Sequence, residues 1–147
     1  MRITVTLPCF LLIFSLPSLA HVTPESCLDI NRSVGVSMTD AMIRDFGIGE
    51  QEIVLNSTVM TLIDKNRVTL PLASLYAKQS YNQEATHFLS ESELISIFMT
   101  SNSTNIIVKY DYVNHENKHN VTIASLLVND DECSVRFNDY IVIKREF

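Results

Sequence analysis

The clearest alternation of apolar and polar residues lies in the last third of the chain. Residues 105–113 place apolar or aromatic side chains at every second position, which is typical of a strand with one buried face. The residues on that face are Ile106, Val108, Tyr110 and Tyr112. Residues 121–128 and 133–144 also have strand character, and a bulge at Asn138-Asp139 resets the alternation in the second of these runs. We therefore expect three consecutive strands in an antiparallel meander.

The segment after residue 27 predicts two short elements. Residues 28–36 alternate loosely and are interpreted as a first strand. Thr39 is a typical N-cap, and Gly47 is a typical stop signal, so we expect a helix of about two turns over residues 40–46.

Residues 52–63 are rich in β-branched side chains and predict another strand. A polar turn at 64–67 leads into a short strand at 68–72, so this part of the chain is interpreted as a hairpin. Residues 73–90 show little periodicity and are interpreted as a loop with a helical turn around Leu75.

Ser90 and Glu93 have the spacing of a capping box, and the apolar residues that follow predict a helix over about 91–101. We expect this principal helix to pack on the sheet. The fold class expected is mainly β (β-rich α+β): a curved antiparallel sheet or small barrel with this helix and a short N-terminal helix.

The first twenty residues have the composition of a signal peptide. Arg2 precedes an apolar run without acidic residues, and Ser18-Leu19-Ala20 supplies small residues for cleavage. Pro8 and Pro17 interrupt the run, which makes an uncleaved membrane anchor the less favoured interpretation. We expect a cleaved signal peptide at 1–20, a single exported domain at 21–147, and no membrane span after cleavage.

The charge of the chain excludes some partners. Lys and Arg total 11 and Asp and Glu total 17, a net charge of −6, which becomes −7 once Arg2 is removed. This acidity argues against nucleic acid and anionic membranes as partners, because both need clustered positive charge. With only three glycines, the chain has no glycine-rich phosphate-binding loop.

The cysteines indicate an oxidising compartment. Cys9 leaves with the signal peptide, so Cys27 and Cys133 remain, and we expect them to form a disulfide. Two free thiols or an intermolecular bridge are the alternatives.

Four N-x-[ST] sequons give candidate glycosylation sites, which are Asn31, Asn56, Asn102 and Asn120. The expected localisation is secreted or periplasmic, and the sequence leaves the source kingdom open.

Residues 115–119 match the zinc-hydrolase motif H-E-x-x-H, with His115 and His119 as candidate ligands and Glu116 as candidate base. The motif needs a helix, but this stretch is polar and joins two predicted strands, so it is interpreted as an exposed hairpin loop. A third ligand could come only from a small set of residues, namely His87, Asp130, Asp131 and Glu132. We therefore expect no metal, no cofactor and no enzymatic activity, and a zinc hydrolase that uses His115, Glu116 and His119 is the minor alternative.

The expected function is non-enzymatic binding of a protein or glycan partner. The candidate contact regions are the loop at 114–120 and the segment at 77–90. Tyr110 and Tyr112 are expected in the core rather than in a binding platform. An alternative is an accessory protein that stabilises a larger exported partner, for example through pairing of an edge strand at 138–144.

The order of elements also resembles the OB-type B subunits of bacterial AB5 toxins. Cysteines near both ends, a short N-terminal helix, a hairpin, and a helix at 91–101 running into a strand at 105–113 carry this resemblance in outline. No residue motif carries it, so no site residues are transferred. The resemblance implies a five-stranded barrel, a pentameric ring and binding of cell-surface glycans.

Overall fold

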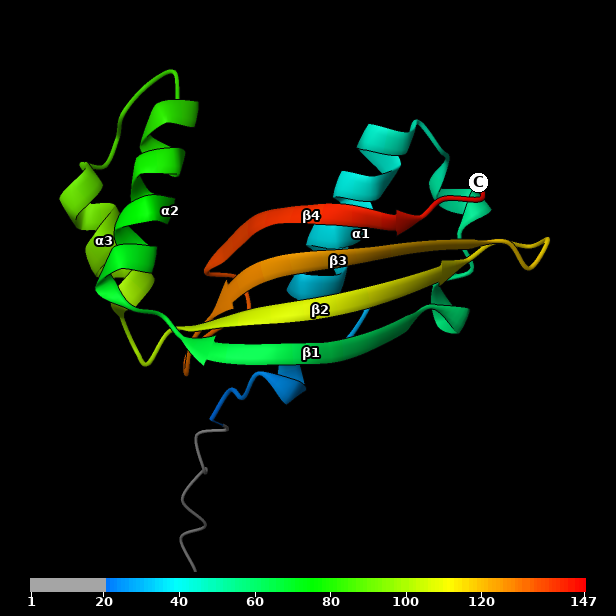
Figure 1. The fold of residues 1–147 in the computed structure, drawn as a ribbon, viewed down its shortest axis with the longest axis horizontal. Coiled ribbons are helices and arrows are strands. Elements are labelled where there is room, and N and C mark those ends of the chain that lie inside the picture. The colour runs from blue at the N-terminus through cyan, green and yellow to red at the C-terminus, as the bar shows by residue number, and fades with distance from the viewer. Residues whose placement is uncertain (1–20) are drawn as a thin grey trace, which may run out of the picture.

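The structure is a computed structural model in which residues 21–147 are described. The predicted signal peptide at 1–20 lies outside the described residues. The elements in Figure 1 are α1 (Ser33–Phe46), β1 (Val59–Arg67), α2 (Leu70–Gln83), α3 (Glu91–Met99), β2 (Thr104–Val113), β3 (His119–Val128) and β4 (Arg136–Lys144). Three single turns of 3-10 helix complete the set, which are η1 (Glu25–Cys27), η2 (Glu50–Glu52) and η3 (Leu55–Ser57).

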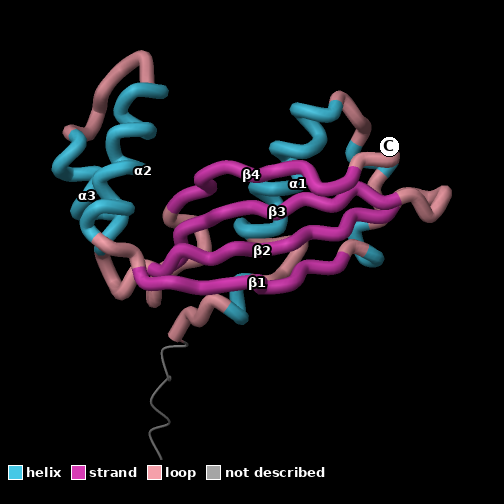
Figure 2. Tube along the Cα trace, in the orientation of Figure 1, coloured by secondary structure: helices cyan, strands magenta, loops and turns pink. Residues whose placement is uncertain are grey.

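The four strands form one antiparallel sheet in the order β1-β2-β3-β4. Figure 2 shows them side by side and curved along their length. The predicted three-strand meander is confirmed, because β2, β3 and β4 pair consecutively over nearly the expected residues. The predicted bulge is also present: Ser125 pairs with Asp139 and Leu126 with Phe137, which leaves Asn138 as the extra residue.

Helix α1 covers one face of this sheet and forms the main core with it. The alternating residues of β2, from Ile106 to Tyr112, are fully buried in that core. The Tyr110 hydroxyl donates to the carbonyl oxygen of Val34 at 3.0 Å, and the Tyr112 hydroxyl lies 3.1 Å from Thr39 Oγ1. The expectation that both tyrosines belong to the core is confirmed, and their polar atoms have partners there.

Helix α1 is longer than predicted and replaces the strand expected at 28–36. Thr39 lies inside the helix, where its hydroxyl donates to the carbonyl oxygen of Gly35 at 2.8 Å instead of capping an N-terminus. A Cβ atom on Gly35 would lie 2.3 Å from the backbone of Ile30, so this glycine lets the preceding loop approach the helix closely. Gly47 ends the helix in the left-handed conformation, as predicted.

The region between α1 and β1 also differs from the prediction. Residues 50–52 and 55–57 form the turns η2 and η3, and the strand expected at 52–63 lies at 59–67. The polar residues 64–67 do not turn, because they pair with Thr104–Ile107 of β2. Sheet pairing thus overrides their local turn preference.

Residues 70–83 form helix α2. The predictions of a short strand at 68–72 and of a loop at 73–90 are therefore wrong for most of their length. Pro71 lies in the first turn of α2, where a missing backbone N–H is tolerated. Ala73 and Ala77 are buried on the helix face that packs on α3. Small residues here allow close packing of the two helices, but they give only a weak apolar periodicity.

Helix α3 confirms the predicted helix at 91–101, two residues shorter. Its capping box is formed: the Glu93 N–H donates to Ser90 Oγ at 3.3 Å, and the Ser90 N–H donates to Glu93 Oε2 at 2.8 Å. Helix α3 pairs with α2 in a hairpin, whose small core includes Leu127 of β3. The principal helix on the sheet is therefore α1, not the predicted one at 91–101.

The fold is mixed α+β and β-rich, as expected, and the sheet is open. Within residues 21–147, β1 and β4 each have a single neighbouring strand, so the barrel alternative is wrong. The five-stranded barrel implied by the resemblance to AB5 toxin B subunits is likewise not formed by the described residues. None of the helices in this part of the chain is both long and apolar enough to cross a membrane.

Candidate functional site

The face of the sheet opposite α1 is called the open face here. The α2–α3 hairpin packs on one end of it through Leu127, whose neighbours Leu126 and Val128 turn to the α1 side. Because side chains alternate along each strand, Ile123 of β3 shares the open face with Leu127. Ile123 is paired across the sheet with Ile141 of β4. No helix of residues 21–147 covers the rest of this face (Figure 1).

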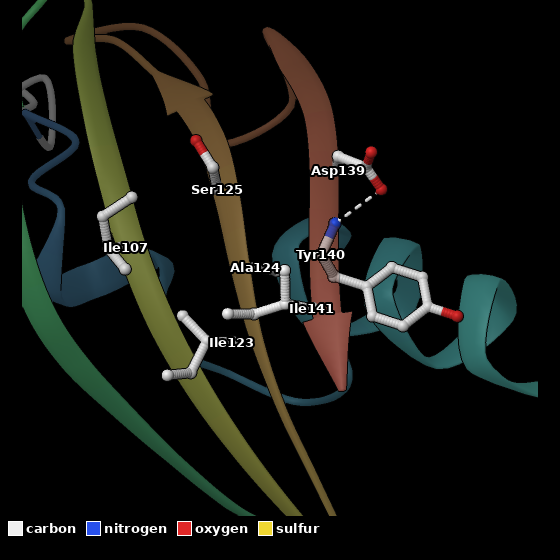
Figure 3. Close-up of a pocket in the computed structure, with 7 residues that line it drawn as sticks. All are labelled: Ile107, Ile123, Ala124, Ser125, Asp139, Tyr140 and Ile141. Atoms are coloured by element: carbon white, nitrogen blue, oxygen red, sulfur yellow. Dashed lines mark hydrogen bonds between the residues drawn. The ribbon is translucent and has the colours of Figure 1, made fainter. Parts of the chain in front are cut away.

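A shallow groove of about 280 Å³ lies on the open face (Figure 3). The residues that line it are Ile107, Ile123, Ala124, Ser125, Asp139, Tyr140 and Ile141. The isoleucines come from three adjacent strands, and Ile141 is 60% exposed. Three of the lining residues have polar side-chain groups: the Ser125 hydroxyl, the Asp139 carboxylate and the Tyr140 hydroxyl. An antiparallel sheet usually presents polar residues to water on its uncovered face, so this aliphatic surface is unusual.

Tyr140 contributes little more than its backbone to the groove, because its ring points toward α1 (Figure 3). Its hydroxyl donates to Asp45 Oδ2 at 2.9 Å. Burial raises the pKa of Tyr140 to about 12, and the hydrogen bond to the Asp45 carboxylate adds to the increase. The hydroxyl is therefore protonated at neutral pH and fastens β4 to the end of α1.

A polar network closes the end of the groove near α2. Asn138 Nδ2 donates to Ser125 Oγ at 2.9 Å, and Ser125 Oγ donates to Asn105 Oδ1 at 2.8 Å. Arg136 Nε donates to Asn138 Oδ1 at 2.9 Å, and its guanidinium lies 5.4 Å from the centre of the Tyr76 ring. These bonds hold the bulge of β4 in place beside the hairpin, so the groove has a rigid end wall.

The first four residues of the H-E-x-x-H motif, 115–118, lie in the turn between β2 and β3, and His119 is the first residue of β3, so the motif is not on a helix. His115 Nε2 is 3.1 Å from the carbonyl oxygen of Gln51, and His119 Nδ1 is 2.6 Å from Asp111 Oδ1. Glu116 pairs with Lys118 at 2.6 Å, and this hydrogen bond holds the pKa of the carboxyl below its usual range. A lowered pKa is the opposite of what a general base near neutral pH requires.

The candidate third ligands do not join the two histidines. Among residues 21–147 no group of three or more His, Cys, Asp or Glu side chains is arranged to hold a metal ion. His87 instead stacks on the ring of Tyr81, with centroids 3.8 Å apart. Asp130 and Asp131 follow β3. They accept hydrogen bonds from Asn102 and Ser101, respectively, which lie in the turn that precedes β2.

The two cysteines outside the predicted signal peptide lie at disulfide distance, in agreement with the expected pairing. The sulfur atoms of Cys27 and Cys133 are 1.97 Å apart, and the bridge spans 106 positions of the sequence. Cys27 is fully buried in the core between α1 and the sheet. The bridge therefore ties the segment before α1 to the segment before β4.

Asn120 is not an accessible glycosylation site in this fold. Its side chain is fully buried, and its amide is used in three hydrogen bonds to the backbone of the last two residues. Its Nδ2 donates to the carbonyl oxygen of Phe147 at 2.9 Å, and its Oδ1 accepts from the N–H groups of Glu146 at 2.8 Å and Phe147 at 3.2 Å. A glycan on Asn120 of the folded chain would displace all three bonds.

The other three sequon asparagines are exposed and lie off the strands. Asn31 precedes α1, and Asn56 lies in η3, where both border a hollow that also contains His115. Asn102 lies in the turn between α3 and β2, where Asp130 accepts from its Nδ2 at 2.6 Å.

The two predicted contact regions lie at opposite ends of the sheet (Figure 1). The 114–120 region is the β2–β3 turn and the start of β3, and residues 77–83 of the other region belong to α2. Its remaining loop carries Phe88, whose side chain is 87% exposed. The structure does not bring the two regions together into one site.

Sequence reasoning missed the groove itself. The sequence signal for it was that two strands carry apolar residues on both faces. Ile106 and Ile107 are adjacent in one, and residues 141–143 form an uninterrupted aliphatic run in the other. Such runs are typical of strands covered on both sides or of an interaction surface. No protein-family model, no curated protein and no solved structure matches this chain.

Proposed function

We propose that the chain is an exported, non-enzymatic binding module whose open face docks a protein partner. The observation that carries this proposal is the shallow groove lined by Ile107, Ile123 and Ile141, of which Ile107 and Ile123 are half-buried and Ile141 is exposed. A contiguous apolar patch on a stable sheet is a typical interaction surface, because burying it on a partner removes it from water. Polar side chains lie beside the groove on the β1 side, as at the rim of protein interfaces: Lys109 is paired with Ile123, and Thr61 is paired with Lys109.

The composition of the groove favours a protein partner over a glycan. A sugar exchanges hydrogen bonds to water for hydrogen bonds to the protein, and here the lining offers it chiefly the Ser125 hydroxyl and the Asp139 carboxylate. Hydroxyl groups buried against isoleucines would lose hydrogen bonds without replacement. Aliphatic side chains of a partner protein carry no such penalty.

Two further features support the proposal. The disulfide-distance cysteines and the exposed sequons agree with an oxidising, extracytoplasmic environment. The net charge of −7 for residues 21–147 favours association with a basic partner.

Photo-crosslinking tests the proposal. Ile123 is replaced with a photoreactive phenylalanine analogue, and the purified chain is irradiated in extracellular fluid of the source organism. The matched control carries the same group at Phe88, which is exposed and apolar but lies on the α2–α3 loop. We expect a discrete second protein to crosslink from position 123 and not from position 88. Excess wild-type chain competes for this product, whereas excess I141K chain does not.

The proposal is overturned if position 123 gives no protein product, or if positions 123 and 88 give the same products. A product that contains only carbohydrate favours the glycan alternative and also overturns it. Circular dichroism and thermal unfolding of each variant show that the fold is retained, which separates loss of binding from loss of structure.

A further inference from the structure

We infer that a second copy of this chain pairs antiparallel with the free edge of β4, so that two four-stranded sheets join into one eight-stranded sheet. This inference concerns the edge of the sheet and does not depend on the function proposed for its open face. It is carried by the unpaired backbone of β4, by its exposed apolar side chains and by the charges at its two ends.

Among residues 21–147, the one strand paired with β4 is β3. Along an antiparallel edge strand, every second residue directs its N–H and C=O groups to the neighbouring strand. The N–H and C=O groups of the residues between them point outward, in the plane of the sheet, away from β3. One of the N–H groups of β4, that of Tyr140, donates to Asp139 Oδ1 at 2.7 Å (Figure 3). An unpaired row of this kind is a template for an added strand.

The two edges of the sheet differ in what lies beside them. Both edge strands are bulged, β1 between Leu62 and Asp64 and β4 at Asn138 and Ile143, so bulges do not distinguish the edges. The bulge of β1 is followed by charged and polar residues, and Lys65 among them pairs with Glu25 at 2.5 Å, which brings η1 beside this edge. A covering segment of this kind hinders pairing with a further strand. We therefore place the association at β4.

The central part of β4 has the side chains of a buried strand but is exposed. Ile141, Val142 and Ile143 are 60%, 46% and 56% exposed, and no charged residue interrupts them. Side chains on both faces of the strand are apolar, so a second strand beside it would bury surface above and below the sheet. The end of α1 extends past β4 behind the sheet (Figure 1), where it would lie beneath the added strand.

The charges of β4 identify the added strand as a second copy. Asp139 precedes the apolar run, and Lys144 follows it. The register shift at Ile143 places Asp139, Ile141 and Lys144 on the same face, opposite Ser125, Ile123 and Val121 of β3. When two copies run antiparallel about a twofold axis near Ile141, Asp139 of each lies beside Lys144 of the other, whose intramolecular partner is Glu146 at 2.9 Å. Opposite charges facing across two strands stabilise their pairing, and like charges destabilise it. The strand is thus self-complementary, as a twofold interface requires.

The experiment measures the mass of residues 21–147, purified with the disulfide intact, by sedimentation equilibrium from micromolar to near-millimolar concentration. We expect a monomer–dimer equilibrium. D139K and K144D each place like charges opposite one another, and each raises the dimer dissociation constant by about tenfold. The double variant D139K/K144D exchanges the two charges and restores the wild-type constant. The matched control D64K, which changes an exposed acid on β1, leaves the constant unchanged.

The inference is overturned if the wild-type chain remains monomeric throughout this range. It is also overturned if D139K and K144D leave the dimer intact, if their effects add in the double variant, or if D64K dissociates the dimer as strongly. Amide hydrogen exchange provides a second measurement. Dimer formation slows exchange in residues 141–143, and unchanged exchange there contradicts pairing through β4.

Discussion

The buried amide of Asn120 gives a quantitative test of the structure. Its three hydrogen bonds attach β3 to the backbone of Glu146 and Phe147, in a region that sequence alone assigns to a glycosylation site. Asn120→Ala removes all three bonds and most of the buried side chain. The matched control is Asn56→Ala, which alters an exposed sequon asparagine in η3 and leaves these bonds intact.

The expected cost follows from these contacts. Each hydrogen bond contributes roughly 0.5–1.5 kcal/mol net, so loss of three gives about 3 kcal/mol if their effects add. The backbone groups of residues 146–147 can recover bonds to water when the segment detaches, which reduces the cost to about 2–3 kcal/mol. For a domain of this length that corresponds to a decrease in Tm of roughly 10 °C.

Urea unfolding followed by circular dichroism measures this cost for wild type, N120A and N56A. We expect N120A to lower the free energy of unfolding by about 2–3 kcal/mol and N56A to lower it by less than about 0.5 kcal/mol. Equal stabilities of N120A and wild type would refute the assigned hydrogen bonds. A glycan found on Asn120 of the folded chain would refute its burial.

Two further predictions concern the same core. Replacing Cys27 and Cys133 with serine opens a loop spanning 106 positions. The chain-entropy model gives a loss of about 4.7 kcal/mol in the free energy of unfolding, which urea unfolding measures. An unchanged urea midpoint would contradict the bridge. Burial raises the pKa of Tyr110 and Tyr112, and that of Tyr140 to about 12. Since tyrosine in the unfolded chain ionises near pH 10, stability is complete below that pH and decreases as pH rises above it. An ultraviolet titration in which all five tyrosines ionise together near pH 10, before unfolding, would contradict this burial.

The parts of the fold predicted from sequence are those whose signals are local. Strand β2 alternates strictly, with apolar residues on the core side, and α3 begins at the Ser90–Glu93 capping box, so period and cap were enough to find these two elements. The bulge at Asn138 was also predictable, because it interrupts the alternation of β4.

The missed elements depend on tertiary contacts. Helix α2 buries Ala73 and Ala77 against α3, and small residues give no strong periodic signal. Helix α1 contains Gly35 and Thr39, which are a helix breaker and a cap in isolation. In the fold, Gly35 accommodates the backbone of Ile30, and Thr39 bonds to the Tyr112 hydroxyl. Local propensity was overridden in both helices.

The candidate site was least predictable because it joins residues from three strands. The adjacency of Ile107, Ile123 and Ile141 follows from strand register and from the position of α1, neither of which the sequence specifies without the fold. The H-E-x-x-H motif is the opposite case, in which the sequence contains the pattern of a site that the fold does not form. Its spacing matches a zinc site, but the required helix is replaced by a turn.

The central claim is that the open face is a protein-binding surface, and hydroxyl-radical footprinting tests it most directly. The oxidation rates of Ile107, Ile123 and Ile141 are compared in the purified chain and in the extracellular fluid of its source, with Phe88 as the internal reference. The account predicts that the three isoleucines become protected in the fluid while Phe88 remains reactive. Equal oxidation of the isoleucines in both conditions would contradict it.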